Sequence, residues 1–196
     1  LLEGATPAQI DQVLFDFGFP MGPFAMMDLA GLDIGWQEST SSSSTIREIL
    51  CETGRRGQKN GLGFYTYDST TRAPTPDQDV VALIREFAES KHIAQREITN
   101  QEILERCLYP MVNEGAKILE EEIAIRGSDV DVVWINGYGW PMYTGGPMFW
   151  ADTIGLQELV QKIKEHSVSQ GGEHWNLSPL LERLATDDKQ LQSYSN

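Results

Sequence analysis

The sequence predicts an all-α fold made of two tandem helical repeats, residues 1–95 and 96–196. Three observations lead to this prediction. A motif of aromatic, glycine and proline residues occurs twice, apolar residues recur at helical spacing behind capping residues, and no stretch alternates long enough to predict a sizeable sheet. Each repeat is therefore expected to contain a helix, a tight turn and a second helix.

The duplicated motif lies at residues 17–24, Phe-Gly-Phe-Pro-Met-Gly-Pro-Phe, and its first half returns at residues 138–142 as Tyr-Gly-Trp-Pro-Met. In each copy, glycine relieves backbone crowding and proline opens the next helix at its first position. Two interpretations stay open: an apolar corner packed for stability, and a surface that lines a ligand. The matching spacing extends further, since Gly22-Pro23, Asp28 and Gly31-Leu32 correspond to Gly146-Pro147, Asp152 and Gly155-Leu156, and Ile10-Asp11 corresponds to Val130-Asp131.

The first repeat begins with Thr6-Pro7-Ala8-Gln9, which has the pattern of a capping box. Apolar residues at 10, 13, 14 and 17 then predict an amphipathic helix. After the corner, residues 24–30 are expected to form a helix that ends at a glycine. The Ser/Thr run at residues 39–44 is expected to be a flexible surface loop, and residues 45–48 form a second capping box.

Residues 54–67 form a glycine-rich loop that carries Arg55, Arg56 and Lys59 and ends in alternating aromatics. Backbone N–H groups and a lysine in such a loop can hold a phosphate, but the strand–loop–helix context of a P-loop is absent. A solvated turn is the favoured interpretation, and a phosphate site is the alternative. Residues 72–76 are expected to be a linker, with Thr75-Pro76-Asp77-Gln78 capping the helix that follows.

The second repeat is expected to open with a long helix that is capped by residues 99–102 and contains Pro110. Because proline removes one hydrogen bond of the helix, a kink is expected there. Residues 128–131 begin the repeated helix, and the apolar spacing from Leu156 to Ile163 predicts another helix after the second copy. Ser178-Pro179 opens a last short helix.

The composition limits the classes of partner. A formal net charge of −14 disfavours nucleic acid and anionic membranes, because both are bound through clustered Lys and Arg. Cys51 and Cys107 lack the spacing of a disulfide framework or a zinc site and are expected to be reduced thiols. No apolar run of about 18 residues and no secretory signal are found. The chain has no initiator Met and opens on Leu1-Leu2-Glu3-Gly4, a pattern typical of the last turn of a helix with glycine after its end. We therefore expect an excised fragment.

No catalytic residue and no metal site are predicted in this chain. A dinucleotide fold would need a GxGxxG turn between a strand and a helix, and the sequence has no such unit. Because Asp28 and Asp152 share one spacing, capping or a buried hydrogen bond is favoured for them over a pair of reacting carboxylates. Asn113 is notable because asparagine inside a helix is mildly unfavourable. The histidines His92, His166 and His174 have no partner in a recognisable catalytic arrangement and are expected on the surface.

Residues 17–33 resemble the C-terminal domain of the L-3-hydroxyacyl-CoA dehydrogenases, and residues 57–65 resemble the signature that closes that domain. Residues 103–114 and 137–148 resemble the additional C-terminal repeat of multifunctional β-oxidation enzymes. The similarity is closest to the peroxisomal bifunctional type, which joins enoyl-CoA hydratase/isomerase to 3-hydroxyacyl-CoA dehydrogenase. The resemblance implies two repeats of the 6-phosphogluconate dehydrogenase C-terminal domain-like fold, packed as a pseudo-dimer.

The resemblance also implies a reaction, the NAD-dependent oxidation of (3S)-3-hydroxyacyl-CoA in fatty-acid β-oxidation. In the family, NAD is bound by a Rossmann domain and catalysis uses a His–Glu pair; both would lie upstream of Leu1, together with the hydratase domain. The family's substrate-contacting Asn would also lie there, and no catalytic role carries over to Asn113 at the corresponding place of the second repeat. The chain is therefore expected to be inactive alone, with NAD bound by the missing domain. A helical lid of this kind can orient acyl-CoA and exclude water.

Six residues are candidates for contact with acyl-CoA. Phe19, Pro20 and Met21 lie on the first corner, and Asn136 and Trp140 belong to the second by similarity to its Gly-aromatic-Pro turn. Lys59, with Arg55 and Arg56 beside it, would bring positive charge to a CoA phosphate.

A rival interpretation is a non-catalytic acyl-CoA-binding or assembly/dimerisation module, in which the duplicated corners only form an interface. Residues 192–196 do not form the Ser-Lys-Leu ending that peroxisomal import recognises. The peroxisomal matrix, for a eukaryotic protein, and the cytoplasm, for a bacterial one, therefore both stay open.

Overall fold

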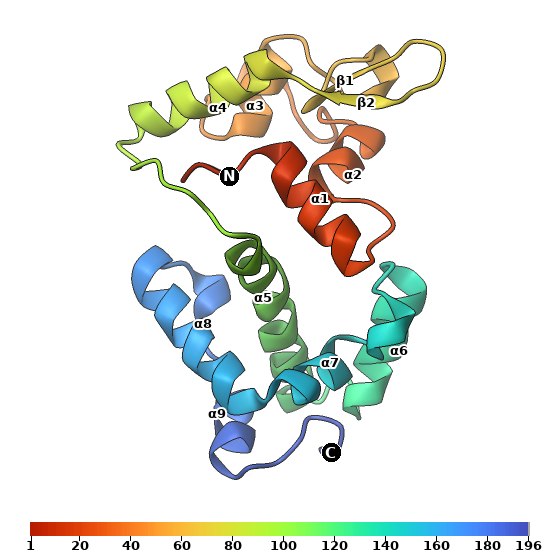
Figure 1. Ribbon diagram of the computed structural model, residues 1–196, viewed down its shortest axis with the longest axis vertical. Helices are drawn as coiled ribbons and strands as arrows, with labels where there is room; N and C mark the ends of the chain where they lie inside the picture. The colour runs from red at the N-terminus through yellow and green to blue at the C-terminus, as the bar shows by residue number, and fades with distance from the viewer. Residues whose placement is uncertain (196) are drawn as a thin grey trace. The chain divides into compact units, whose positions relative to one another are not determined.

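The computed structural model describes residues 1–195, and its regular structure is almost entirely helical (Figure 1). This confirms the prediction of an all-α protein. No helix among the described residues is both long and apolar enough to cross a membrane. The α-helices are α1 Pro7–Phe17, α2 Pro23–Ala30, α3 Ile46–Glu52, α4 Gln78–Ser90, α5 Asn100–Glu120, α6 Gly127–Gly137, α7 Pro147–Ile154, α8 Leu156–Gln170 and α9 Pro179–Thr186, with short 3₁₀ turns η1 Glu38–Thr40, η2 Gln58–Asn60, η3 Met142–Thr144 and η4 Glu173–Trp175.

The chain divides into two compact units. Unit 1 comprises Leu1–Asp16 and Pro20–Asn100, and unit 2 comprises Phe17–Phe19 and the chain from Gln101 onward. Assignment of the units to two repeats divided at residue 95, and the packing of those repeats as a pseudo-dimer, stay predictions.

Unit 1 contains two short strands, β1 Tyr65–Tyr67 and β2 Pro74–Pro76, paired antiparallel with Thr66 opposite Thr75. The predicted linker at residues 72–76 is therefore wrong in part, because β2 occupies it. Proline at both ends of a three-residue strand is compatible only with a sheet edge, which is why the sequence pattern failed to indicate a strand. The core of the unit is formed by apolar residues from α2 to α4: Leu32, Ile46, Leu50, Cys51, Phe64, Tyr65, Tyr67, Val80 and Ile84.

The capping predictions in unit 1 are partly right. The Thr45–Glu48 capping box is complete, since each residue's backbone N–H donates to the other's side chain. Thr6 accepts from the Gln9 backbone N–H at 3.1 Å, but the Gln9 side chain donates to the Ile98 carbonyl rather than back to Thr6. Within the predicted capping segment 75–78, the cap of α4 is Asp77, whose carboxylate accepts from two backbone N–H groups.

The predicted serine loop lies at the surface, as expected, and forms hydrogen bonds with α3. The hydroxyl of Ser43 donates to Glu52 at 2.7 Å, and the hydroxyl of Ser44 donates to Glu48 at 2.7 Å. At the start of the chain, Leu1–Gly4 form a turn in which the Gly4 N–H donates to the Leu1 carbonyl.

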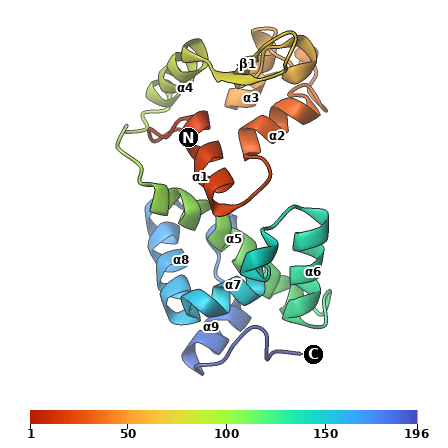
Figure 2. The ribbon, with the colours of Figure 1, turned by 45° about the vertical axis from the view of Figure 1, so that its right-hand side comes forward.

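In unit 2, α5 runs between α6 on one side and α8 on the other, as both views show (Figures 1 and 2). Its buried face meets apolar residues of α7, α8 and α9 in one continuous core. The pair of helices α6 and α7 corresponds in sequence to α1 and α2 of unit 1. The backbone agrees, because the glycines that end α2 and α7 have nearly the same conformation: Gly31 at φ 108°, ψ 121° and Gly155 at φ 101°, ψ 121°. Side-chain-bearing residues rarely adopt a φ in this range, which explains glycine at both positions.

Candidate functional site

Asp11 holds the start of α2 in unit 1. Its carboxylate accepts from the backbone N–H groups of Phe24 at 2.9 Å and Ala25 at 2.8 Å, and from the Tyr65 hydroxyl at 2.8 Å. The first N–H groups of a helix have no partner within the helix, and here a residue of the preceding helix supplies one. Glycine is required at position 22, because a Cβ there would lie 2.3 Å from the Asp11 carboxyl carbon.

Asp28, in α2, holds the start of β1. The fully buried carboxylate accepts from the N–H groups of Phe64 at 2.9 Å and Tyr65 at 3.0 Å, and from the Tyr67 hydroxyl at 2.9 Å. We refer to Asp11, Asp28, Tyr65 and Tyr67 as the first clamp. It confirms that Asp28 forms buried hydrogen bonds.

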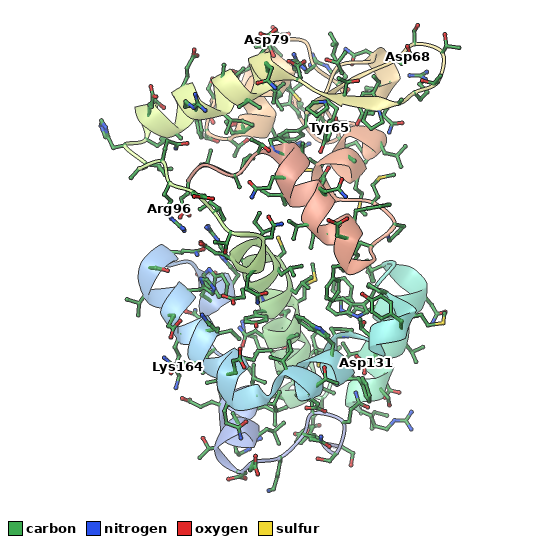
Figure 3. The ribbon with its side chains drawn as sticks, in the orientation of Figure 1. Tyr65, Asp68, Asp79, Arg96, Asp131 and Lys164 are labelled. Carbon is green, nitrogen blue, oxygen red and sulfur yellow. The ribbon has the colours of Figure 1, made fainter. Side chains whose placement is uncertain are left out.

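Unit 2 contains the same arrangement, which we call the second clamp: Asp131, Asp152 and Gln192. Asp131 accepts from the N–H groups at the start of α7, Met148 at 2.7 Å and Phe149 at 3.3 Å, and from Gln192 Nε2 at 2.6 Å. Figure 3 shows Asp131 where α6 and α7 meet. Asp152 accepts from the N–H groups of Leu191 at 2.8 Å and Gln192 at 3.0 Å.

Burial raises the pKa of all four clamp carboxyls above the ordinary value, although their hydrogen bonds oppose the shift. For Asp131 the pKa rises to about 6. Burial also raises the pKa of the Tyr65 and Tyr67 hydroxyls. The carboxylates of Asp11 and Asp28, which accept hydrogen bonds from these hydroxyls, raise it further. Both tyrosines therefore stay protonated as donors.

Two of the predicted lining residues, Phe19 and Trp140, lie together in the interior of unit 2. Their ring centroids are 5.5 Å apart in an edge-to-face arrangement, and Phe17 packs edge-on against both Trp140 and Trp150. The Trp140 indole donates to Thr144 Oγ1 at 2.6 Å. The duplicated corner is therefore a packed aromatic cluster at these positions.

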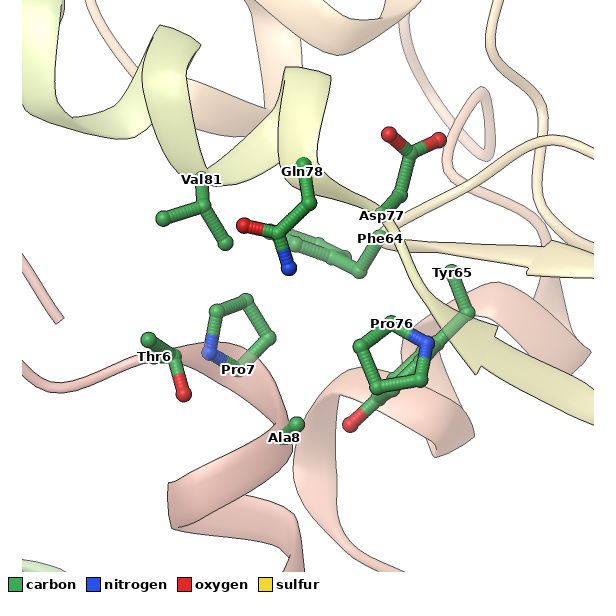
Figure 4. A pocket seen from close by; sticks show the side chains of 9 residues that line it. All are labelled: Thr6, Pro7, Ala8, Phe64, Tyr65, Pro76, Asp77, Gln78 and Val81. Atoms are coloured by element: carbon green, nitrogen blue, oxygen red, sulfur yellow. The ribbon is translucent and has the colours of Figure 1, made fainter.

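Pro20 and Met21 lie elsewhere, on an open groove of about 390 Å³ in unit 1. Phe15 of α1 lines it as well, and the groove also reaches Tyr65 and Tyr67 of the first clamp. A smaller cavity of about 90 Å³ lies between the starts of α1 and α4, where the Tyr65 ring reaches from β1 toward α1 (Figure 4).

The basic residues of the glycine-rich loop are engaged within unit 1. Arg55 pairs with Asp77 at 2.7 Å and also donates to the Gly63 carbonyl. Arg56 donates to the Cys51 carbonyl and lies over the Trp36 ring. Lys59 is the exposed one, and its ammonium donates to Asp33 at 2.6 Å, which holds the pKa of Asp33 below its ordinary value.

The two asparagines of unit 2 differ. Asn136 is exposed on α6, where its side chain donates to the Val132 carbonyl at 2.8 Å. Asn113 is fully buried: its amide nitrogen donates to the Asn176 carbonyl at 2.8 Å, and its amide oxygen accepts from the Ser178 N–H at 2.8 Å. Asn113 thus fastens the connection between α8 and α9 to α5.

His166 corrects one expectation from the sequence. It is half-buried and pairs with Glu105 of α5, Nε2 to Oε2 at 3.1 Å, while its ring stacks on Trp175. His92 and His174 are exposed, as expected. The pair went unpredicted because its members lie 61 residues apart and only the packing of α5 against α8 brings them together. Within residues 1–195, no group of three His, Cys, Asp or Glu side chains is placed to hold a metal ion.

The roles of Asp11, Asp131, Tyr65 and Gln192 were missed from the sequence. One signal was present, the matching Ile10-Asp11 and Val130-Asp131 pairs upstream of the two corners. The Tyr65 and Gln192 partners had no signal, since each lies more than 50 residues from the aspartate it reaches.

Comparison with known proteins agrees with the duplicated geometry. A family model described as the C-terminal domain of 3-hydroxyacyl-CoA dehydrogenase matches residues 1–67 and 103–193. The human peroxisomal bifunctional enzyme is 42% identical over an alignment that covers 100% of this chain and 29% of the relative. Fatty acid oxidation complex subunit alpha of Vibrio cholerae is 32% identical, with 96% and 27% covered. The chain thus spans less than a third of the length of these relatives.

One solved structure with a similar fold is the dehydrogenase part of multifunctional enzyme 1 from C. elegans. It superposes with a TM-score of 0.71 at 29% sequence identity, covering 92% of this chain and 42% of that one. The two stretches matched by the family model contain every carboxylate of both clamps and every backbone group that they hold.

Proposed function

Because this chain belongs to the family of 3-hydroxyacyl-CoA dehydrogenase C-terminal domains, we propose that it is the C-terminal helical part of a multifunctional fatty-acid β-oxidation enzyme. In that enzyme it would serve the NAD-dependent oxidation of (3S)-3-hydroxyacyl-CoA. The observation that carries the proposal is the family match to two stretches, each of which contains one complete aspartate clamp.

The contribution of this chain is positional: it closes over acyl-CoA and braces the dehydrogenase. Hydride transfer needs the two reactants held in register with water excluded, and a rigid helical wall supplies both without a proton-transfer group. The clamps support this role, because in each unit they fix a helix start and a later segment through charge-assisted hydrogen bonds.

NAD is assigned to a domain other than this one. The described residues have only one antiparallel pair of three-residue strands, and a dinucleotide site needs parallel strands joined through a glycine-rich turn and a helix. These residues therefore do not fit the cofactor.

The groove beside Pro20 and Met21 is the part of unit 1 that we assign to substrate contact. Its walls are largely apolar and it is open to solvent, as suits part of an acyl thioester. Phe19 and Trp140 are buried within unit 2, so they would support its aromatic cluster rather than contact acyl-CoA directly. Lys59 would face a phosphate of CoA, while Asn136 lies on exposed α6 and is the weakest of the six candidates.

A direct test compares two forms. We expect this chain alone to show no NADH oxidation with acetoacetyl-CoA above background, and a chimera in which it replaces the aligned part of the human relative to show turnover. Turnover by the chain alone would overturn the assignment of the chemistry to another domain. Acyl-CoA binding by the isolated chain, with an inactive but folded chimera, would favour the rival, a non-catalytic binding or assembly module.

The Lys59 assignment has a matched control. Lys59 and Lys164 are about equally exposed, 55% and 51%, and each pairs with one carboxylate, Asp33 and Glu182. In the chimera, Lys59→Ala should weaken acyl-CoA binding several-fold and lower its dependence on salt, while Lys164→Ala should change neither. Equal behaviour of the two variants would remove Lys59 from the site.

A further inference from the structure

An uncharged stretch of unit 2 leaves apolar side chains at the surface. Residues 132–151 contain no Asp, Glu, Lys or Arg, in a chain in which 22% of residues are charged. Within this stretch, Val132 and Val133 of α6 and Tyr138, Met142 and Tyr143 of the turn after it are each between 56% and 76% exposed. We refer to these five residues as the α6 face.

Val132 and Val133 of the α6 face lie on a helix with few neighbours. Within unit 2, α6 packs chiefly against α7, and its own buried residues are Gly127, Val130 and Asp131. Tyr138 is held in place by its ring contact with Trp134, 5.0 Å between centroids, and Tyr143 by its hydroxyl, which donates to the Phe17 carbonyl. The exposed rings are therefore fixed in position, as the side chains of an interface usually are.

The equivalent helix of unit 1 treats the same positions differently. Counted from the shared aspartates, Val132 and Asn136 correspond to Gln12 and Asp16. On α1 these two form a polar pair, with Gln12 Nε2 donating to Asp16 at 2.7 Å. The second copy carries a valine where the first carries a solvated amide, so the repeat itself does not require an apolar residue there.

Depletion of charge together with exposed tyrosine and methionine is the composition of a protein–protein interface core. We propose that the α6 face docks a folded domain equivalent to one in the unmatched part of the relatives' chains, through an uncharged, apolar surface on that domain. The human relative has more than twice as much chain outside the match as inside it, and the C. elegans dehydrogenase part also extends beyond its match.

A second copy of this chain is the less suitable occupant. Each copy carries a formal charge of −14, so pairing two copies places like charges around the rim of the contact. The proposal rests on the proposed place of this chain in a longer enzyme, but not on the reaction assigned above, because the docking surface is read out by exchange and not by turnover.

Hydrogen exchange tests the proposal on the chimera with the human relative. Backbone amides of residues 132–149 should exchange about tenfold or more slowly in the chimera than in the isolated chain. Val132→Asp should restore the faster exchange in the chimera. Val168→Asp is the matched control, because Val168 is 90% exposed on α8 of the same unit and lies outside the face; it should leave the protection unchanged. Equal exchange in the two forms would overturn the proposal.

A second measurement needs only the isolated chain. Sedimentation across a hundredfold range of concentration should show a monomer for the unaltered chain and for both variants. A dimer that Val132→Asp abolishes and Val168→Asp leaves intact would assign the face to a second copy and overturn the proposal.

Discussion

The two clamps share one backbone plan and differ in the side chain that completes it. In both, one aspartate accepts from two N–H groups at a helix start and the other from two N–H groups of a later segment. Tyr65 bridges the two aspartates of the first clamp through its N–H and hydroxyl, and Gln192 bridges those of the second through its N–H and amide. The duplication has thus kept the carboxylate-to-backbone hydrogen bonds, while the third donor has varied.

The two clamps differ most at their second aspartates, Asp28 and Asp152. Asp28 serves three donors and is fully buried, whereas Asp152 serves two and is half-buried. Asp28→Ala leaves three buried donors unpaired and should lower the free energy of unfolding of unit 1 by about 3–5 kcal/mol. Asp152→Ala should lower that of unit 2 by about 1–3 kcal/mol. Hydrogen exchange in denaturant reads the two units separately; equal losses would show that the Tyr67 hydroxyl adds nothing to the first clamp.

The glycines against the first aspartates give the next largest effect. A Cβ at Gly22 or Gly146 would lie 2.3 Å from the nearest atom of Asp11 or Asp131, so both Gly→Ala variants should overpack the clamp and cost about 1–3 kcal/mol. Gly146 also has a φ of 99°, and Gly22 has −77°. Gly146→Ala should therefore cost about 1–2 kcal/mol more than Gly22→Ala. Thermal unfolding of both variants checks the order, and the reverse order would contradict the geometry.

The bridging side chains should matter less. Tyr65→Phe removes one hydroxyl that donates to Asp11 and should cost about 1–2 kcal/mol, because the carboxylate keeps its two backbone donors. Gln192→Met removes the equivalent donor to Asp131 and should cost a similar amount. Urea unfolding measures both. A much larger loss for Tyr65→Phe would show that its ring packing is disturbed, and Tyr65→Leu, which removes ring and hydroxyl together, would then separate the two contributions.

Local rules and repeated spacing explain what the sequence predicted well. The helices, the complete Thr45 capping box and the hydrogen-bonding roles of Asp28 and Asp152 follow from patterns within a few residues or from the match between the two copies. For α4 the pattern Thr-Pro-Asp-Gln offers two capping residues, and the structure uses the later one, Asp77, because Thr75 is paired in β2. The partners from distant segments could not be predicted: Tyr65 for Asp11, Gln192 for Asp131 and Glu105 for His166 all depend on tertiary packing.

The pH dependence of the second clamp gives the smallest and most specific test. Burial raises the Asp131 pKa in the folded chain to about 6, against an ordinary value of 3.8. Between these values the folded state holds a proton that the unfolded state has released, so the contribution of Asp131 to stability is greatest below pH 4 and decreases as the pH rises through 6. In Asp131→Asn this part of the pH dependence should disappear, while the parts due to the first clamp remain. The ¹³C shift of the Asp131 carboxyl, followed by NMR from pH 3 to 8, locates the midpoint directly. A midpoint below the ordinary value would mean that its three hydrogen bonds outweigh the cost of burial.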